Sequence, residues 1–424
     1  MKIGIIIGRI GGVDGVALET EKWIHVFHKM GHQVFILSGE YEDRKIEAEK
    51  ETVLPILSFF APETRWEQKH AFFHPEEEPE AVVEHIDTAA EFIAKKIERW
   101  IRKRELDIVI SENASALPSH LSMGVGIKRA VERTGINTIT HDHDFSWERD
   151  SRYVSPFKQI NRLIDVTFPL RLPNSKHAVI NTYGQETLKK KYGRDSAMVP
   201  NVMDFNKPFG VLKNRNKKLR KDLGLKKKDI LLFQITRIVR RKGIEVAIEL
   251  INKLQDKNIK LVITGNHYDD NKGEYNQELI DKIFELKLEL QVIFGNRYIS
   301  NHVGEAPDIK SQYSLSDAYA NACACTYFSY YEGFGNAFVE AVLAKTPIFV
   351  NNYKPVYWPD IGSKGFKTVM LEDNNLTDET VKEMDTIIRD KKLQKEIAEH
   401  NFELGKKLFS YNVLEEKLDE LIRF

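Results

Sequence analysis

SYYEGFGNAFVEAVLA, residues 329–344, sets two carboxylates around a glycine-rich turn. Glu332 stands at the start of the turn, and Glu340 follows it eight positions later. The apolar run before the stretch predicts a buried strand, and the spacing of apolar residues after the turn predicts an amphipathic helix that begins about Asn336. Strand, loop and helix in this order form the repeating unit of a parallel α/β sheet.

The glycine-rich turn also predicts an anion site. Gly333 and Gly335 would leave backbone N–H groups unpaired next to the positive end of the helix dipole, which favours a phosphate. Glu332 would lie at the mouth of this site, and Glu340 would offer an acceptor for vicinal hydroxyls of a sugar or ribose. The combination favours a nucleotide sugar, although each glutamate alone could be a solvated helix residue and the turn could be purely structural.

A second candidate element lies about ninety residues upstream. The apolar run 230–235 predicts a buried parallel strand, and it is followed by TRIVRRKG and a helical segment. Arg237 and Lys242 would then project from one loop at the carboxyl end of the strand, where two fixed cations can neutralise a diphosphate leaving group. Arg240 and Arg241 are expected to be solvated. The alternative is that the whole basic cluster is a surface face.

The N-terminus, MKIGIIIGRIGGVDG, predicts a first strand followed by a glycine-rich loop and a helix from about Val16. Its glycines do not fit the G-x-G-x-x-G fingerprint of dinucleotide-binding proteins. Gly11 and Gly12 would still let a ligand approach the backbone, and Asp14 is a weaker candidate for acceptor binding. A tight turn without a ligand is the alternative interpretation.

A further polar stretch, THDHDFSWERDSRY at residues 140–153, follows another predicted strand. His141 stands at the end of this strand, where a histidine can simply be satisfied by backbone hydrogen bonds. No third ligand can be assigned beside His141 and His143, so no metal site is predicted. Arg149 and Arg152 could recognise a carboxylate or phosphate on an acceptor, because guanidinium groups pair with such anions in a bidentate way.

Composition limits the function further. Lys plus Arg equals Asp plus Glu at 63 each in a chain of 424 residues, so no overall charge favours nucleic acid or an anionic membrane. No apolar stretch approaches the roughly 20 residues of a membrane span, and the first apolar run is broken too early for a signal peptide. We expect a cytoplasmic protein with no nucleic-acid partner and no integral membrane contact. Cys323 and Cys325 are expected to pack in the core.

The chain length and two series of alternating strands and helices predict two doubly wound domains. We expect a first domain over 1–203, a second over 204–408, and a C-terminal helix over 409–424 that packs back on the first. Residues 40–79 are a long insertion with little periodicity, which could be a lid, an acceptor loop or an oligomer contact.

The segment EGFGNAFVE resembles the E-x7-E signature of retaining glycosyltransferases of family 4, and the helix and strand that follow match as well. This resemblance implies a GT-B fold, in which two Rossmann-like domains face each other across a cleft. It implies that Glu332 approaches the donor sugar, Glu340 the ribose and His141 the sugar. TRIVRRKG resembles the donor-phosphate pair of the family, and VPNVMD its P-N-G-V-D segment, with Val202 where glycine is usual. The chain further resembles the branch that includes sucrose-phosphate synthase-like and mannosylglucosylglycerate synthase-like enzymes.

The function that the resemblance implies, together with the residues above, is retaining transfer of a hexose, glucose or mannose, from a donor such as UDP-glucose or GDP-mannose to a small acceptor that could be anionic. The catalytic candidates are Arg237, Lys242, Glu332 and His141; the donor-binding candidates are Gly12, Gly333, Phe334, Gly335, Asn336, Ala337 and Glu340; the acceptor-binding candidates are Gly11, Asp14, Arg149 and Arg152. The alternatives are a GT-B sugar phosphorylase or epimerase, a non-catalytic sugar-nucleotide-binding protein, and an oxidoreductase, which the missing fingerprint disfavours. No cofactor is expected besides the nucleotide sugar, and Mg²⁺ dependence, the base and the oligomeric state are left open.

Overall fold

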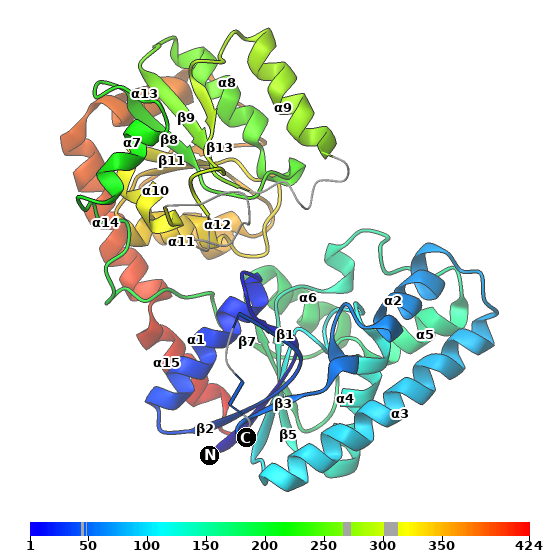
Figure 1. The fold of residues 1–424 in the computed structure, drawn as a ribbon. Helices are drawn as coiled ribbons and strands as arrows, with labels where there is room; N and C mark the ends of the chain where they lie inside the picture. The colour runs from blue at the N-terminus through cyan, green and yellow to red at the C-terminus, as the bar shows by residue number, and fades with distance from the viewer. Residues whose placement is uncertain (44–45, 48, 266–272, 301–312) are drawn as a thin grey trace. The chain divides into compact units, whose positions relative to one another are not determined.

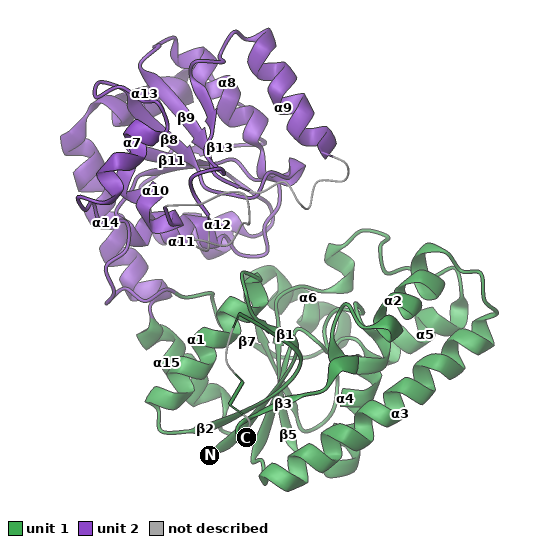
Figure 2. Cartoon of the chain, in the orientation of Figure 1, with its two compact units in different colours: residues 1–202, 411–424 green, residues 203–410 purple. Residues whose placement is uncertain are grey.

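The chain forms two compact units (Figure 2). The computed structural model describes residues 1–43, 46–47, 49–265, 273–300 and 313–424, so three residues of the 40–79 insertion lie outside the described part. Unit 1 comprises residues 1–202 and 411–424, and unit 2 comprises residues 203–410. The chain therefore leaves unit 1 once and returns to it through the C-terminal segment.

Unit 1 is built on a seven-stranded sheet in the order β3-β2-β1-β4-β5-β6-β7 (Figure 1). Every neighbouring pair is parallel, so the carboxyl ends of all strands meet at one edge. The strands are β1 (Lys2–Gly11), β2 (Gln33–Glu42), β3 (Glu51–Val53), β4 (Ile108–Glu112), β5 (Asn137–Asp142), β6 (Ser175–Val179) and β7 (Ser196–Met198). Their continuous apolar sequences, such as IGIII in β1, are those of strands covered on both faces.

Helices cover both faces of this sheet. They are α1 (Gly15–Lys29), α2 (Pro62–Gln68), α3 (Pro79–Arg104), α4 (Leu121–Thr134), α5 (Lys158–Thr167), α6 (Thr182–Tyr192) and the C-terminal α15 (Tyr411–Leu421). The helices α1 and α15 share one hydrophobic core with the sheet, while α3 and α4 share another. Helix α15 contacts α1, and Lys29 of α1 pairs with Glu415 at 2.5 Å.

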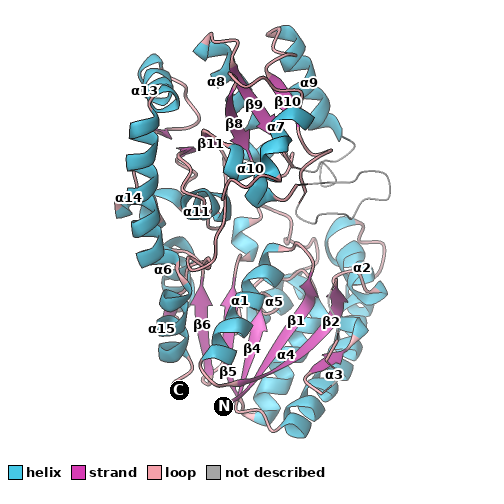
Figure 3. Ribbon diagram, turned by 60° about the vertical axis from the view of Figure 1, so that its left-hand side comes forward, coloured by secondary structure: helices cyan, strands magenta, loops and turns pink. Residues whose placement is uncertain are grey.

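Unit 2 contains a six-stranded sheet in the order β10-β9-β8-β11-β12-β13, which is also parallel throughout (Figure 3). Its strands are β8 (Ile230–Gln234), β9 (Ile259–Ile263), β10 (Val292–Phe294), β11 (Ala324–Tyr327), β12 (Ile348–Asn351) and β13 (Met370–Leu371). Its helices are α7 (Leu219–Asp222), α8 (Ile244–Leu254), α9 (Glu274–Glu285), α10 (Leu315–Asn321), α11 (Asn336–Leu343), α12 (Tyr357–Asp360), α13 (Asp378–Arg389) and α14 (Lys391–Phe409). The prediction of two doubly wound parallel sheets is confirmed.

Three elements were not predicted from the sequence. The edge strands β3 and β13 have three and two residues, which is too short for a recognisable alternation. Helix α2 lies inside the 40–79 insertion, whose sequence has little periodicity, and a π-helical turn over Lys69–Phe73 continues it. Cys325 is buried in β11, as predicted. No helix in the described part of the chain is both long and apolar enough to cross a bilayer.

Helix α2 is tied to α4 by a buried carboxyl group. The backbone N–H of Ser122 donates to Oε2 of Glu67 at 3.2 Å, and Glu67 has no exposed surface. Burial outweighs the hydrogen bonds from Ser122 and raises the pKa of Glu67 to about 7. The group is therefore protonated in the folded chain at pH values where it is ionised in the unfolded chain.

Glu67→Gln is expected to stabilise unit 1 increasingly as pH rises. A carboxyl group whose pKa is higher in the folded chain than in the unfolded chain lowers the free energy of unfolding at pH values above the unfolded pKa. This loss of stability grows with pH until the pH exceeds the folded pKa. The rise in pKa from 4.5 to about 7 corresponds to a loss of stability of roughly 3 kcal/mol at pH 8. This loss, and with it the advantage of Glu67→Gln, vanishes below pH about 4. Urea unfolding of both proteins at pH 4 and pH 8 measures this; a stability difference that is the same at both pH values contradicts it.

Candidate active site

In unit 2, two loops from neighbouring strands meet at the carboxyl edge of the sheet. The first connects β8 to α8, and the second connects β11 to α11. Strands β8 and β11 are paired directly, and the N–H of Tyr330 donates to the carbonyl of Arg241 at 2.8 Å. The basic loop and the EGFG loop, ninety residues apart in the sequence, therefore lie side by side.

An ion cluster joins these loops. Lys242 Nζ donates to Oε1 of Glu332, and Arg241 Nη1 donates to Oε2 of Glu332 at 2.8 Å and to the carbonyl of Tyr331 at 3.1 Å. The side chains of Lys242 and Glu332 are only 10% and 9% exposed, whereas that of Arg241 is 38% exposed. The expectation that Arg241 is solvated was wrong, because the carboxylate of Glu332 draws it into the cluster. Arg240 is mainly exposed, as expected, and pairs with Glu278 at 2.6 Å.

The cluster fixes the charge of its carboxylate. Burial alone would raise the pKa of Glu332, but Lys242 and then Arg241 outweigh it and hold the pKa at about 2. Burial lowers the pKa of Lys242, and Glu332 opposes that shift. Like charge on Arg237 also contributes to the lowered pKa of Lys242, so Arg237 acts on the same group from its exposed position on the loop. The site thus concentrates cations around one buried anion.

Helix α11 begins directly after the EGFG loop, at Asn336 as predicted. Gly335 precedes it with φ of 129°, and a Cβ there would lie 2.1 Å from the hydroxyl oxygen of Tyr353. That hydroxyl donates to the carbonyl of Phe334 at 3.0 Å. Only glycine fits this position, and the first N–H groups of α11 follow it directly. Glu340, one turn into α11, is half-buried and accepts from the hydroxyl of Tyr319 at 3.1 Å.

In unit 1, the glycine-rich loop after β1 has a clear structural role. A Cβ at Gly11 would lie 1.9 Å from the carbonyl oxygen of Glu42, so this position must be glycine for β1 to pair with β2. Asp14 caps α1 by accepting from the N–H groups of Val16 and Ala17 at 3.0 and 3.1 Å. A ligand-binding role for Gly11, Gly12 and Asp14 stays a prediction.

Unit 1 also contains a cavity of about 760 Å³. Five cationic side chains line it against three carboxyl groups, and aromatic rings form part of its wall. The cations are Arg9, Arg65, Lys69, Arg149 and Arg152; the carboxyl groups are Asp14, Glu112 and Asp144; the aromatic residues are Phe59, Phe60, Phe73 and Tyr153. The predicted residues Asp14, Arg149 and Arg152 are therefore brought together. The insertion supplies the residues from Phe59 to His74, which the sequence did not mark as binding residues.

The cations of this cavity differ in how they are neutralised. Arg149 forms an ion pair with Asp144, and Arg9 lies 3.7 Å from Asp14. Within the residues that the structure describes, Arg152 has no carboxylate partner; its guanidinium lies 5.8 Å from the ring centre of Phe73. Arg152 and Arg65 are both exposed at the cavity. The cavity is suited to an anionic molecule that also has an apolar face.

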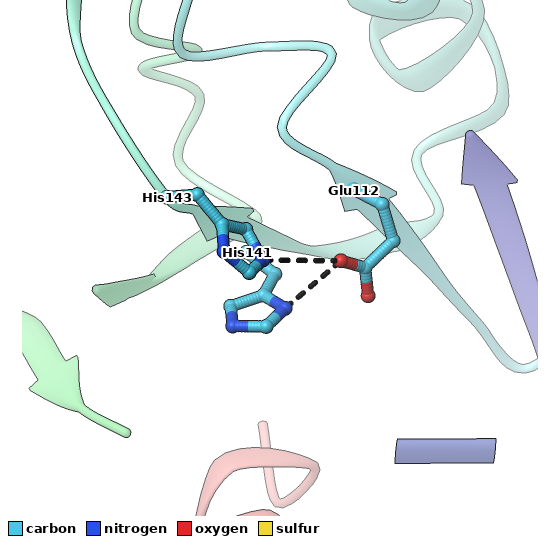
Figure 4. Close-up of side chains that lie close together, drawn as sticks. All are labelled: Glu112, His141 and His143. Carbon is cyan, nitrogen blue, oxygen red and sulfur yellow. Dashed lines mark hydrogen bonds and ion pairs between the residues drawn. The ribbon is translucent and has the colours of Figure 1, made fainter. Parts of the chain in front are cut away.

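His141 belongs to a buried cluster beside this cavity (Figure 4). Its Nδ1 lies 2.8 Å from Oε2 of Glu112, and its ring stacks on Trp23 of α1 with 4.0 Å between ring centres. His143 approaches the same carboxylate oxygen at 3.9 Å. The structure thus supplies Glu112 as the third group that the sequence could not assign. The signal was present, because Glu112 ends the apolar strand LDIVISE and pairs in register with His141.

Burial sets the charges in this cluster. It lowers the pKa values of His141 and His143 to about 3, so both imidazoles are neutral near pH 7. Burial also raises the pKa of Glu112 to about 8. His141 is 1% exposed, so its direct approach to a sugar stays a prediction.

The chain is similar to known proteins. A model of the family "Glycosyl transferases group 1" matches residues 215–403, which include both loops of unit 2. Mannosylglucosylglycerate synthase of Thermotoga maritima is 32% identical, with 99% of each chain covered. The synthase of the same name from Petrotoga mobilis is 31% identical, with 88% of this chain and 86% of the relative covered. The chain belongs to the group 1 glycosyltransferases.

Solved structures show the same fold for this glycosyltransferase. Anabaena HepE in complex with UDP-glucose has a TM-score of 0.67 at 16% identity and is matched over the full length of both chains. Sucrose-phosphate synthase from Thermosynechococcus elongatus has a TM-score of 0.66 at 15% identity, with 100% of this chain and 98% of that chain covered. The two parallel α/β units are those of the GT-B fold. The glycosyltransferase is an enzyme, as predicted.

Proposed function

We propose that this glycosyltransferase moves a hexose, with retention, from a nucleotide diphosphate sugar to a small acceptor that carries a carboxylate. The observation that supports the donor half is the ion cluster of unit 2, in which Lys242 and Arg241 converge on the carboxylate of Glu332. A diphosphate is an alternative counter-ion for the same cations. HepE, a protein of the same fold, is seen in complex with UDP-glucose, which agrees with a nucleotide-sugar donor.

In the proposed reaction, the bond between the anomeric carbon and the diphosphate breaks while the acceptor oxygen bonds to that carbon from the same face. The acceptor hydroxyl proton passes to the departing diphosphate oxygen. Lys242, Arg237 and the N–H groups of residues 335–337 stabilise the charge that develops on the diphosphate. When the donor binds and its diphosphate takes the cations, Glu332 turns toward the donor sugar. Glu340 accepts hydrogen bonds from the ribose hydroxyls.

The acceptor half rests on the cavity of unit 1. Its excess of cations favours an anion, and its aromatic wall can pack on the apolar face of a sugar ring. The name of the two relatives describes a product that contains mannose, glucose and glycerate. We therefore propose a glucoside of glyceric acid as acceptor and mannose as the transferred sugar. A role for the 40–79 insertion as acceptor loop follows, while the cytoplasmic location stays a prediction.

A product assay tests this function. The chain is incubated with glucosylglycerate and one nucleotide sugar at a time: GDP-mannose, UDP-mannose, UDP-glucose or ADP-glucose. The products are detected by mass spectrometry and proton NMR. We expect one product, in which the transferred mannose is attached to glucosylglycerate and keeps the anomeric configuration that it had in the donor. Product with inverted configuration contradicts retention. In a parallel reaction with inorganic phosphate and no nucleotide sugar, cleavage of glucosylglycerate to a hexose 1-phosphate and glycerate would favour a sugar phosphorylase. Binding of the donor without any product would favour a non-catalytic protein.

Arg152→Ala is expected to raise the KM for the anionic acceptor by about tenfold or more, with little change in the KM for the donor. The reason is that removal of one charge-assisted hydrogen bond costs about 1.5–3 kcal/mol. Initial rates with glucosylglycerate and with the neutral analogue glucosylglycerol measure the two acceptor KM values. Only the carboxylate of glucosylglycerate loses an ion pair with Arg152, so only its KM should rise. Arg171→Ala is the control, since Arg171 is not among the residues that line the cavity and stacks near Tyr192 instead. Equal losses for both acceptors contradict the assignment.

A further inference from the structure

The cluster of Glu112, His141 and His143 has the composition and arrangement of a metal site. One carboxylate oxygen and one nitrogen from each imidazole all lie within 4.8 Å of one another. Figure 4 shows both rings directed at the same carboxylate. Two imidazole nitrogens and one carboxylate oxygen form a ligand set that binds Zn²⁺ in proteins.

The sheet holds these three groups together. Strands β4 and β5 are paired in register at Glu112 and His141, so the two side chains lie on the same face of the sheet. His143 follows His141 by two residues and returns to that face, where the two ring centres are 4.2 Å apart. Asn113 fixes the backbone there by accepting from the N–H of His143 at 3.0 Å. The positions of the ligands are thus set by regular structure.

The internal contacts of the cluster do not satisfy the imidazole of His143. Nε2 of His143 is buried and has no hydrogen-bond partner among the described residues. Its distance of 3.9 Å to Glu112 exceeds a hydrogen bond. Ligand atoms bound tetrahedrally at about 2.0–2.2 Å lie roughly 3.4 Å apart. A cation at the centre would therefore draw His143 closer and move His141 slightly away from Glu112.

The cluster also borders the cavity of unit 1, because Glu112 and its neighbour Asn113 line that cavity. A cation could enter by this route. Three protein ligands would leave a coordination position for water or for an oxygen of a molecule in the cavity.

We propose that Glu112, His141 and His143 bind one divalent transition-metal ion, with Zn²⁺ as the best fit. The proposal goes beyond the glycosyl transfer proposed above and does not depend on it. It departs from the sequence-based expectation of no metal site, which rested on the lack of a third ligand.

The test uses the untagged full-length chain after dialysis against a chelator. Calorimetric titration with Zn²⁺ alone should give one site per chain, and Co²⁺ should give the visible absorption of a four- or five-coordinate ion. His143→Ala should weaken Zn²⁺ binding beyond the 10–100-fold that loss of an outer-shell partner costs. His143 is the residue to change, because His141 also packs on Trp23 and its loss could unfold the unit.

The control is His177→Ala. His177 forms a second buried pair, in which its Nδ1 lies 3.0 Å from Asp142 Oδ2, but no third metal-ligating residue joins it within the part of the chain that the structure describes. Zn²⁺ binding by this variant should equal that of the unmodified chain. The proposal is overturned if the unmodified chain binds no stoichiometric Zn²⁺, or if His143→Ala binds it as well as His177→Ala does.

Discussion

Lys242→Ala is expected to lower kcat by about 10²–10³-fold, the usual effect of removing one preorganised donor to a developing negative charge. Lys242 is a buried cation in the loop after β8, and its ammonium reaches the EGFG loop through Glu332. In the proposed reaction its interaction strengthens as the diphosphate departs, so kcat falls more than the KM for the donor rises. Steady-state rates at varied donor concentration measure both constants.

The matched control is Arg240→Ala, two positions earlier on the same loop. Arg240 is 64% exposed and pairs with Glu278 instead of Glu332. Its loss should leave kcat within about twofold, because exposed ion pairs contribute little. If Lys242→Ala and Arg240→Ala have the same kcat, Lys242 does not stabilise the leaving group.

Glu332→Ala is expected to destabilise unit 2 and to make it more responsive to anions. Removing the carboxylate leaves Lys242 buried without its partner, which costs about 3 kcal/mol. The value is at the low end for buried pairs because Arg241 is more than one-third exposed. A loss of this size corresponds to a fall in Tm of roughly 10 °C for a unit of this length. Thermal unfolding measures it, and activity should be lost as well.

Inorganic pyrophosphate should restore part of this lost stability. In the unmodified chain a diphosphate competes with Glu332 for Lys242 and Arg241. In Glu332→Ala these two cations have lost that carboxylate, so a diphosphate should bind them more tightly and stabilise the chain more. The rise in Tm caused by pyrophosphate should therefore be larger in the variant. Glu278→Ala, which removes the exposed partner of Arg240, serves as the control and should behave like the unmodified chain. An equal or smaller rise in Glu332→Ala would mean that the cations of the cluster do not bind diphosphate.

The residues of the candidate site in unit 2 could be marked in the sequence because they lie in two short contiguous segments, and their binding roles stay predictions. The glycines and Glu332 mark the loop before α11, and Lys242 stands in the basic loop after β8. The partner of Lys242 could not be predicted, since a contact across ninety residues depends on which strands are neighbours. For the same reason Arg241 looked like a surface residue until Glu332 was found beside it.

Unit 1 was less predictable. Its cavity combines Arg9 from the first strand, Arg149 and Arg152 from the loop after β5, and the aromatic residues of the insertion. Helix α2 and the π-helical turn carry few apolar residues in a helical period, so their sequence resembled an irregular loop. Glu112 was passed over because a single glutamate at a strand end is common, and only the strand pairing with His141 gives it a role.

The most direct test of the account is a crystal structure of the chain with the nucleoside diphosphate that raises its Tm most. We predict that both phosphates contact Lys242 and the N–H groups of residues 335–337, with the Lys242–Glu332 contact broken. Phosphates bound instead among Arg65, Arg149 and Arg152 of unit 1, with the ion cluster of unit 2 intact, would contradict the proposed donor site.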